Sequence, residues 1–151
     1  MNSNCNPNPR SDTDKVTIPT SSVSCHLAIL SWNIHDGMNG SEGLKADDTD
    51  FIDHLSDCNV FCLQETKREF QIPNYKCFNQ LRPDSRSGGL CIGIHRAMAD
   101  IVKVISTKHD DIQAISLIPD PNCPGDIYTI INIYDSPENS SYKAKRKGLN
   151  S

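Results

Sequence analysis

The sequence has no apolar run near the about 18–20 residues that a bilayer span requires. It also lacks the charged start and apolar core of a secretory signal. No cysteine pair has Cys-x-x-Cys spacing, and no His-x₃₋₅-His pair accompanies one, which argues against a zinc site. These absences point away from membrane, secreted and zinc-finger proteins. We therefore expect a soluble intracellular protein, nuclear or cytoplasmic.

Charge of either sign is also modest. The net charge of −4 gives no electrostatic reason for strong nonspecific binding to nucleic acid. The basic cluster lies in residues 143–151, which we interpret as a solvated tail. Residues 1–24 contain few large apolar side chains and are predicted to be a flexible leader. The folded domain is therefore expected to span residues 25–142.

The seven cysteines are an odd number, and several of them lie in or beside apolar runs. Cys62, Cys77 and Cys91 have such surroundings, where a free thiol behaves as a small hydrophobe. This distribution favours a reducing compartment.

Two apolar runs, residues 27–30 and 60–63, predict buried strands. We expect the first to be apolar on both faces, as in the middle of a covered sheet. Asp47, Asp48 and Thr49 offer helix caps between the runs, and Phe51, Ile52 and Leu55 then form one apolar stripe. A strand, a helical crossover and a second strand predict a parallel unit.

Short apolar runs separated by turn signals follow in the second half of the domain. They predict strands near residues 75–78, 88–94, 101–105, 112–118 and 127–134. The predicted fold class is therefore mixed α/β, with a sheet built partly from a helical crossover and partly from antiparallel hairpins.

Polar side chains end both strands of the predicted parallel unit. Asn33 follows the first strand and Glu65 the second, and the carboxyl ends of neighbouring parallel strands meet at one sheet edge. Oxygen ligands of this kind suit Mg²⁺. Alone, Asn33 could be a turn residue and Glu65 could start a helix. Tyr134 ends the last strand, where it could be a rim residue or could hold a phosphoryl oxygen.

Four short motifs occur in the order and approximate spacing of one known family. The motifs are residues 32–34, 63–66, 87–90 and 132–134. Together they resemble the endonuclease/exonuclease/phosphatase superfamily. The closest likeness is to the endonuclease domain of non-LTR retrotransposons, over about residues 26–142.

This resemblance implies the N-terminal part of a four-layer α/β sandwich, deoxyribonuclease-I-like, with a mixed sheet. It implies Glu65 as the Mg²⁺ ligand, Asn33 as support for metal and phosphate, and Tyr134 as the active-site tyrosine. The substrate would be DNA, hydrolysed at a phosphodiester. We interpret His35 as a loop residue, and no role is assigned to Asp135.

The sequence departs from the family after Tyr134. Neither a Gly-Asp-Phe-Asn-like motif nor a Ser-Asp-His-like motif follows it. We therefore expect a truncated domain that is inactive alone, binds Mg²⁺ weakly if at all, and acts on DNA only when a C-terminal half completes it. The strands at 60–63 and 127–134 would then each keep an apolar face without a partner. The alternatives are a non-catalytic interaction remnant and an inositol or lipid phosphatase of the same superfamily.

Overall fold

The computed structural model describes residues 26–38, 43–83, 88–119 and 125–135. Its first sheet has the strand order β1-β2-β4-β3 and its second the order β5-β6-β7. The first sheet contains β1 (Ile29–Asn33), β2 (Val60–Gln64), β3 (Tyr75–Gln80) and β4 (Leu90–His95). The second contains β5 (Val102–Ile105), β6 (Ile112–Leu117) and β7 (Tyr128–Ile133). The predicted leader 1–24, the basic tail 143–151 and motif residue Ser87 lie outside the described residues.

The predicted parallel unit is confirmed. β1 runs parallel to β2, with Ile29 opposite Val60, whereas β4 is antiparallel to both of its neighbours. The crossover contains a short 3₁₀-helix, η1 (Lys45–Asp47), and the helix α1 (Thr49–Ser56). Asp48 caps α1 by accepting hydrogen bonds from the backbone N–H groups of Asp50 and Phe51. The mixed α/β class therefore holds.

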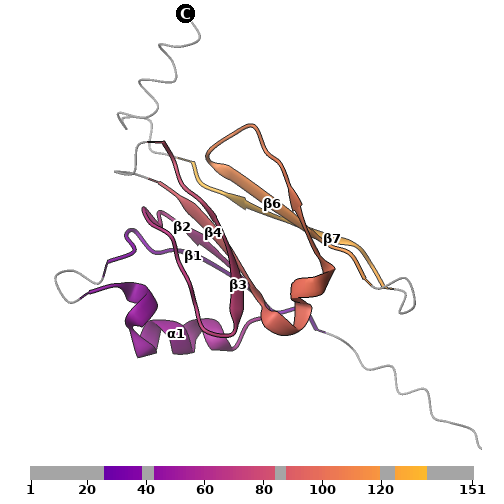
Figure 1. Cartoon of the computed structure of the whole chain (residues 1–151), viewed down its shortest axis with the longest axis horizontal. Coiled ribbons are helices and arrows are strands. Elements are labelled where there is room, and N and C mark those ends of the chain that lie inside the picture. The colour runs from indigo at the N-terminus through magenta and orange to yellow at the C-terminus, as the bar shows by residue number, and fades with distance from the viewer. Residues whose placement is uncertain (1–25, 39–42, 84–87, 120–124, 136–151) are drawn as a thin grey trace, which may run out of the picture.

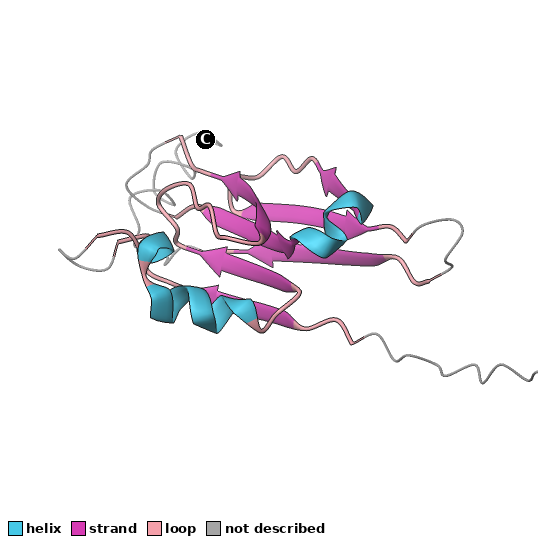
Figure 2. Ribbon diagram, turned by 60° about the horizontal axis from the view of Figure 1, so that its bottom comes forward, coloured by secondary structure: helices cyan, strands magenta, loops and turns pink. Residues whose placement is uncertain are grey.

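The elements stack in layers, with α1 on one side of the first sheet and the second sheet on the other (Figures 1 and 2). One apolar core lies beneath α1 and the second lies between the sheets. The core under α1 includes Phe51, Leu55, Phe61, Leu63, Phe70, Ile72, Tyr75 and Cys91. The core between the sheets contains Val60, Cys62, Ile92, Ile94, Ile115, Leu117 and Ile130. No described element covers the outer face of the second sheet, and no described helix is long and apolar enough to cross a membrane.

The central strand β2 has every residue buried. Alternate residues contribute to the two cores, so α1 covers one face and β7 packs near the other. The prediction that residues 60–63 keep an apolar face without a partner is therefore wrong. The reason is that the second sheet, with β7 as its last strand, already reaches over the middle of the first.

The edge strand β1 differs from its prediction. It is outermost in its sheet and mostly exposed, with Ile29 at 50%. The expectation of a strand in the middle of a covered sheet is therefore wrong, because an apolar sequence on both faces does not show whether another layer covers those faces.

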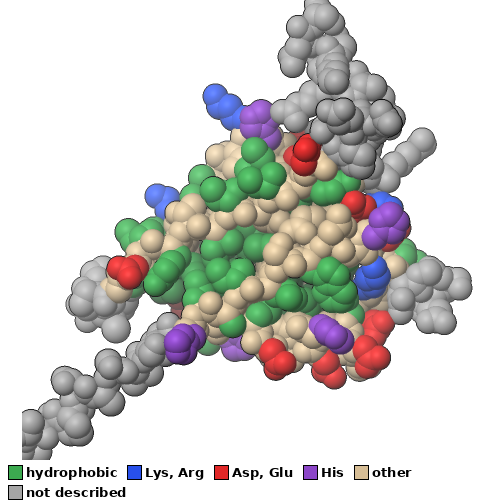
Figure 3. Space-filling model, turned by 180° about the vertical axis from the view of Figure 1, so that it is seen from behind, with side chains coloured by type: hydrophobic (Ala, Val, Ile, Leu, Met, Phe, Trp, Pro, Cys, Tyr) green, Lys and Arg blue, Asp and Glu red, His purple; other side chains and the backbone are tan. Residues whose placement is uncertain are grey.

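The last strand, β7, keeps apolar side chains on its outer face that no described element covers. Ile131 and Ile133 are both more than half exposed, which confirms the prediction for residues 127–134. From behind, apolar side chains gather across the middle of the molecule (Figure 3).

Candidate functional site

Asn33 and Glu65 meet where β1 and β2 end. The register places Asn33 opposite Gln64, so Glu65 is the first residue beyond the paired strands. The Asn33 side-chain amide Nδ2 donates to Glu65 Oε1 at 3.0 Å. The structure thus brings together two predicted site residues that are 32 positions apart in sequence.

The backbone around Glu65 adopts an uncommon conformation. Glu65 and Lys67 have φ of 56° and 55°, and His35 on the neighbouring loop has φ of 64°. Non-glycine residues with such angles are uncommon and often occur at functional sites. Between Glu65 and Lys67, the Thr66 side chain is fully buried. The turn therefore anchors its middle residue in the interior and leaves the Glu65 carboxylate at the rim.

Gly88 and Gly89 hold this turn against the start of β4. The N–H groups of Thr66 and Lys67 donate to the carbonyls of Gly89 and Gly88 at 3.2 and 2.9 Å. Both glycines have positive φ, and a Cβ at Gly89 would lie 2.6 Å from the Thr66 hydroxyl. A Cβ at Gly88 would overlap the Arg82 guanidinium. The glycine pair is therefore needed both for its backbone angles and for close packing.

Tyr134, the third predicted site residue, reaches the same rim from the end of β7. Its backbone N–H donates to the Asp111 carbonyl at 3.0 Å, and its ring lies 5.2 Å from the Arg82 guanidinium carbon. Arg82 is buried and donates through Nε to Asp111 Oδ1 at 2.6 Å. The Tyr134 hydroxyl hydrogen-bonds the Glu65 carboxylate. Asn33, Glu65 and Tyr134 therefore form one connected cluster.

The protonation states in this cluster follow from its contacts. Partial burial would raise the pKa of Glu65, but hydrogen bonds from Asn33 and Tyr134 outweigh it and hold that pKa below its usual value. Burial raises the pKa of Tyr134 to about 12, and the hydrogen bond to Glu65 adds to the effect. At neutral pH the cluster therefore contains an anionic carboxylate beside a neutral phenol.

His35 lies in a loop, as predicted, but it also contacts the site. Its backbone N–H donates to Asn33 Oδ1 at 2.9 Å, and its ring Nδ1 lies 3.3 Å from Glu65 Oε2. Its side chain is 90% exposed. The contact with Glu65 was not predicted. The signal that could have found it is its position two residues beyond Asn33, on the loop that leaves the same sheet edge.

A polar bridge that the sequence did not predict ties the two sheets together beneath the site. Gln64 Nε2 donates to Asn132 Oδ1 at 2.7 Å, and Asn132 Nδ2 donates to the Leu63 carbonyl at 3.0 Å. Asn132 is 2% exposed, so the bridge lies in the interior. It fixes the end of β7 against the end of β2, which are the strands that lead to Tyr134 and Glu65.

The donor set around Glu65 suits a divalent cation of the magnesium type. It provides an ionised carboxylate, and the Asn33 amide oxygen keeps one lone pair after accepting the His35 N–H. Among the described residues, no group of three or more His, Cys, Asp or Glu side chains could hold a metal ion. Mg²⁺ commonly retains several waters and takes one or two carboxylates, so a single carboxylate and an amide fit weak binding.

No family model matches this chain, and no curated protein matches it. Support for a function therefore comes from the geometry around Glu65 and from the four short motifs in the sequence.

Proposed function

We propose that this chain carries the metal-binding part of a magnesium-dependent phosphodiesterase site of the endonuclease type, acting on DNA, in a deoxyribonuclease-I-like sandwich. The observation that carries the proposal is the convergence of three strand ends on one carboxylate. Asn33 and Tyr134 both hydrogen-bond Glu65, although the three residues lie far apart in sequence. A carboxylate supported in this way is poised to hold a hard cation.

Each residue of the cluster has a distinct role in this proposal. Glu65 and Asn33 would hold the ion, which when bound polarises a phosphoryl oxygen and lowers the pKa of water. Tyr134 stays protonated at neutral pH and can donate a hydrogen bond to a phosphate oxygen. Arg82, packed against the Tyr134 ring and bonded to Asp111, is a positioning residue for that phenol.

Two basic residues that follow Glu65, Lys67 and Arg68, join the loops that carry the rim. Lys67 Nζ lies 3.3 Å from Asp36 Oδ2, which joins the loop after β2 to the loop after β1. Arg68 packs against Gly37 on that same loop, where a Cβ would lie 2.6 Å from Arg68 Cγ. The Lys67 charge also contributes to the lowered pKa of Glu65, which keeps this carboxylate ionised for a cation.

The metal site can be tested with Mn²⁺ as a paramagnetic probe in NMR spectra of the purified chain. We expect selective broadening of the amide signals near Asn33 and Glu65, with an affinity of millimolar order because most of the coordination shell remains water. The Glu65→Gln variant should lose the effect. Glu69→Gln, which removes an exposed carboxylate four residues away, should keep it.

Two outcomes of the metal titration would overturn the assignment. Broadening that is unchanged in Glu65→Gln would show that the ion binds elsewhere. Micromolar affinity would require more ligands than Glu65 and Asn33 provide.

The isolated chain should not cleave DNA. Water must be oriented and deprotonated for hydrolysis, and the family's motifs for these tasks do not follow Tyr134. The measurement is nicking of supercoiled plasmid in Mg²⁺. Nicking that Glu65→Ala abolishes would contradict the expected inactivity, while it would support the assignment of Glu65.

A further inference from the structure

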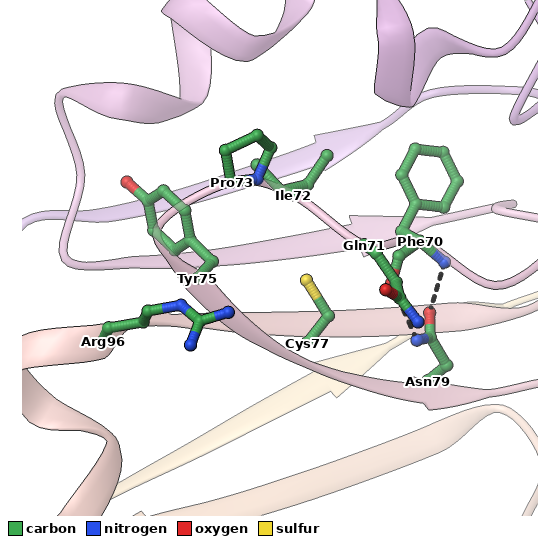
Figure 4. A pocket seen from close by; sticks show the side chains of 8 residues that line it. All are labelled: Phe70, Gln71, Ile72, Pro73, Tyr75, Cys77, Asn79 and Arg96. Carbon is green, nitrogen blue, oxygen red and sulfur yellow. Dashed lines mark hydrogen bonds between the residues drawn. The ribbon is translucent and has the colours of Figure 1, made fainter.

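A cavity lies on β3, and its lining residues are distinct from those of the Glu65 cluster. It has a volume of about 410 Å³ and is shown in Figure 4. The segment of residues 70–73 folds over β3 to form one wall, and Arg96, at the start of the 3₁₀-helix η2 (Arg96–Ile101), closes one end. The lining residues are Phe70, Gln71, Ile72, Pro73, Tyr75, Cys77, Asn79 and Arg96.

Two cysteine thiols meet at the floor of this cavity. Cys77 lies opposite Gly93 and Asn79 lies opposite Cys91, so the two cysteines are diagonal neighbours on one face of the sheet. Cys77 is half-buried and lines the cavity, whereas Cys91 is fully buried behind it. In Figure 4 the Cys77 sulfur points into the cavity, toward Ile72 and Pro73.

The surroundings of Cys77 favour its thiolate. The hydrogen bond from the Cys91 thiol lowers the pKa of Cys77 most, and the Ile72 backbone N–H and the Arg96 charge lower it further, against the effect of burial. By contrast, burial raises the pKa of Cys62 to about 11 and also raises that of Cys58. Cys77 thus differs from Cys58 and Cys62 in two ways: its side chain is more exposed, and its pKa is lowered where theirs are raised.

The positive charge in the cavity wall comes from Arg96. Among its described lining residues, Arg96 is the one charged side chain, and Figure 4 shows its guanidinium on the Cys77 side. The other titratable groups on the face of the sheet around Cys77 are Tyr75 on its own strand, and Cys91 and His95, its two diagonal neighbours on β4. The segment of residues 70–73 contributes no titratable group. A small molecule that enters the cavity therefore meets a thiol beside a fixed positive charge.

We propose that Cys77 is a modification site for small anionic electrophiles, which Arg96 attracts and the cavity orients. The thiol proton is lost to solvent, and the thiolate attacks an electrophilic carbon. A carbon–sulfur bond forms while the leaving group departs with the electron pair of its bond. Cys91 is a positioning residue that donates its S–H to the attacking sulfur. The proposal is independent of the phosphodiesterase function.

The test measures alkylation of the folded chain by iodoacetate and by iodoacetamide, with each cysteine followed by peptide mapping. At pH 7 we expect Cys77 to react at least about tenfold faster than the three buried thiols, Cys58, Cys62 and Cys91. The rate at Cys77 should level off at a lower pH than the about 8.5 of a free thiol. Iodoacetate should be favoured over iodoacetamide relative to free cysteine.

Variants separate the proposed roles from general effects on folding. Arg96→Gln should lower the iodoacetate-to-iodoacetamide rate ratio about two- to fivefold, the size expected for one exposed charge pair. Lys76→Gln, which removes a cation on the opposite face of β3, should leave that ratio unchanged. Cys91→Ala should move the pH midpoint upward, and Cys91→Ser, which restores a donor, should move it back. An unchanged ratio in Arg96→Gln, or a Cys77 midpoint equal to that of free cysteine, would overturn the proposal.

Discussion

The two strands of the parallel unit, β1 and β2, differ sharply in how they are covered. Every residue of β2 is buried, whereas four of the five residues of β1 are exposed. Both begin as apolar runs, and they are paired along their full lengths. The difference therefore comes from what lies over each strand, and little of it comes from the strand's own composition.

The covering layers explain this contrast. On the α1 side, Trp32 of β1 still contacts Phe51, with ring centroids 5.3 Å apart. On the other side, β7 packs near β2 and β4, and Ile29 at the margin stays half exposed. The candidate site lies between the exposed and the buried part of the first sheet, because Asn33 ends the exposed strand β1 and Glu65 follows the buried strand β2.

The buried centre of the first sheet, where β2 pairs with β4, should tolerate added side-chain volume poorly. At Gly93 a Cβ would overlap the Phe61 ring, so Gly93→Ala should lower the free energy of unfolding by about 3 kcal/mol, the upper end of typical overpacking costs. Urea denaturation measures the change. Gly125→Ala is the matched control, because its Cβ would meet its nearest atom at 3.4 Å, and it should be close to neutral. Phe61→Leu combined with Gly93→Ala should recover part of the loss, and failure to recover would mean that the ring is not the obstacle.

Loss of the polar bridge between Gln64 and Asn132 should have the second-largest effect on the free energy of unfolding. Asn132→Ala removes the amide that donates to the Leu63 carbonyl and accepts from Gln64, leaving buried polar groups unpaired. We expect a loss of about 2 kcal/mol in the free energy of unfolding. Thr129→Ala, on the exposed face of the same strand, should cost less than about 0.5 kcal/mol. Equal losses in the two variants would argue against the bridge.

The smallest change in the free energy of unfolding is expected when isoleucines on the two faces of β7 are shortened to valine. Ile130 is 8% exposed and points between the sheets, whereas its neighbour Ile131 is 55% exposed. Ile130→Val should cost about 1 kcal/mol, and Ile131→Val should be neutral within about 0.5 kcal/mol. Thermal or chemical unfolding of the two variants gives the comparison. A comparable loss in Ile131→Val would show that something covers this face in solution.

The sequence predicted local elements well where one short segment decides them. The cap candidates at 47–49 and the stripe after them located α1, and short apolar runs with turn signals located the strands to within a few residues. Asn33 and Glu65 were found because the ends of adjacent parallel strands must meet, a consequence of connectivity. Edge status could not be read in the same way, since it depends on the order in which distant strands pair within the sheet.

The support around Tyr134 was also beyond the sequence. Arg82 and Asp111 are 29 residues apart, and their pairing depends on how the two sheets are set against each other. The glycine pair at 88–89 packs against Arg82 and Thr66, and these contacts became evident only in three dimensions. His35 was similar, because its loop backbone has a positive φ that turns its ring back to Glu65.

The bridge between Gln64 and Asn132 also has a consequence for the order of folding. All four strands of the first sheet lie within residues 29–95, so they leave the ribosome before β7 does. The β3–β4 hairpin and the β1–β2 crossover use contacts closer in sequence than the 68-residue separation of the bridge. Since contacts between distant residues cost more loop entropy, docking of β7 is expected to come late. The rim that Tyr134 shares with Glu65 would then be assembled in two stages, with Asn33 and Glu65 in place first and the tyrosine added last.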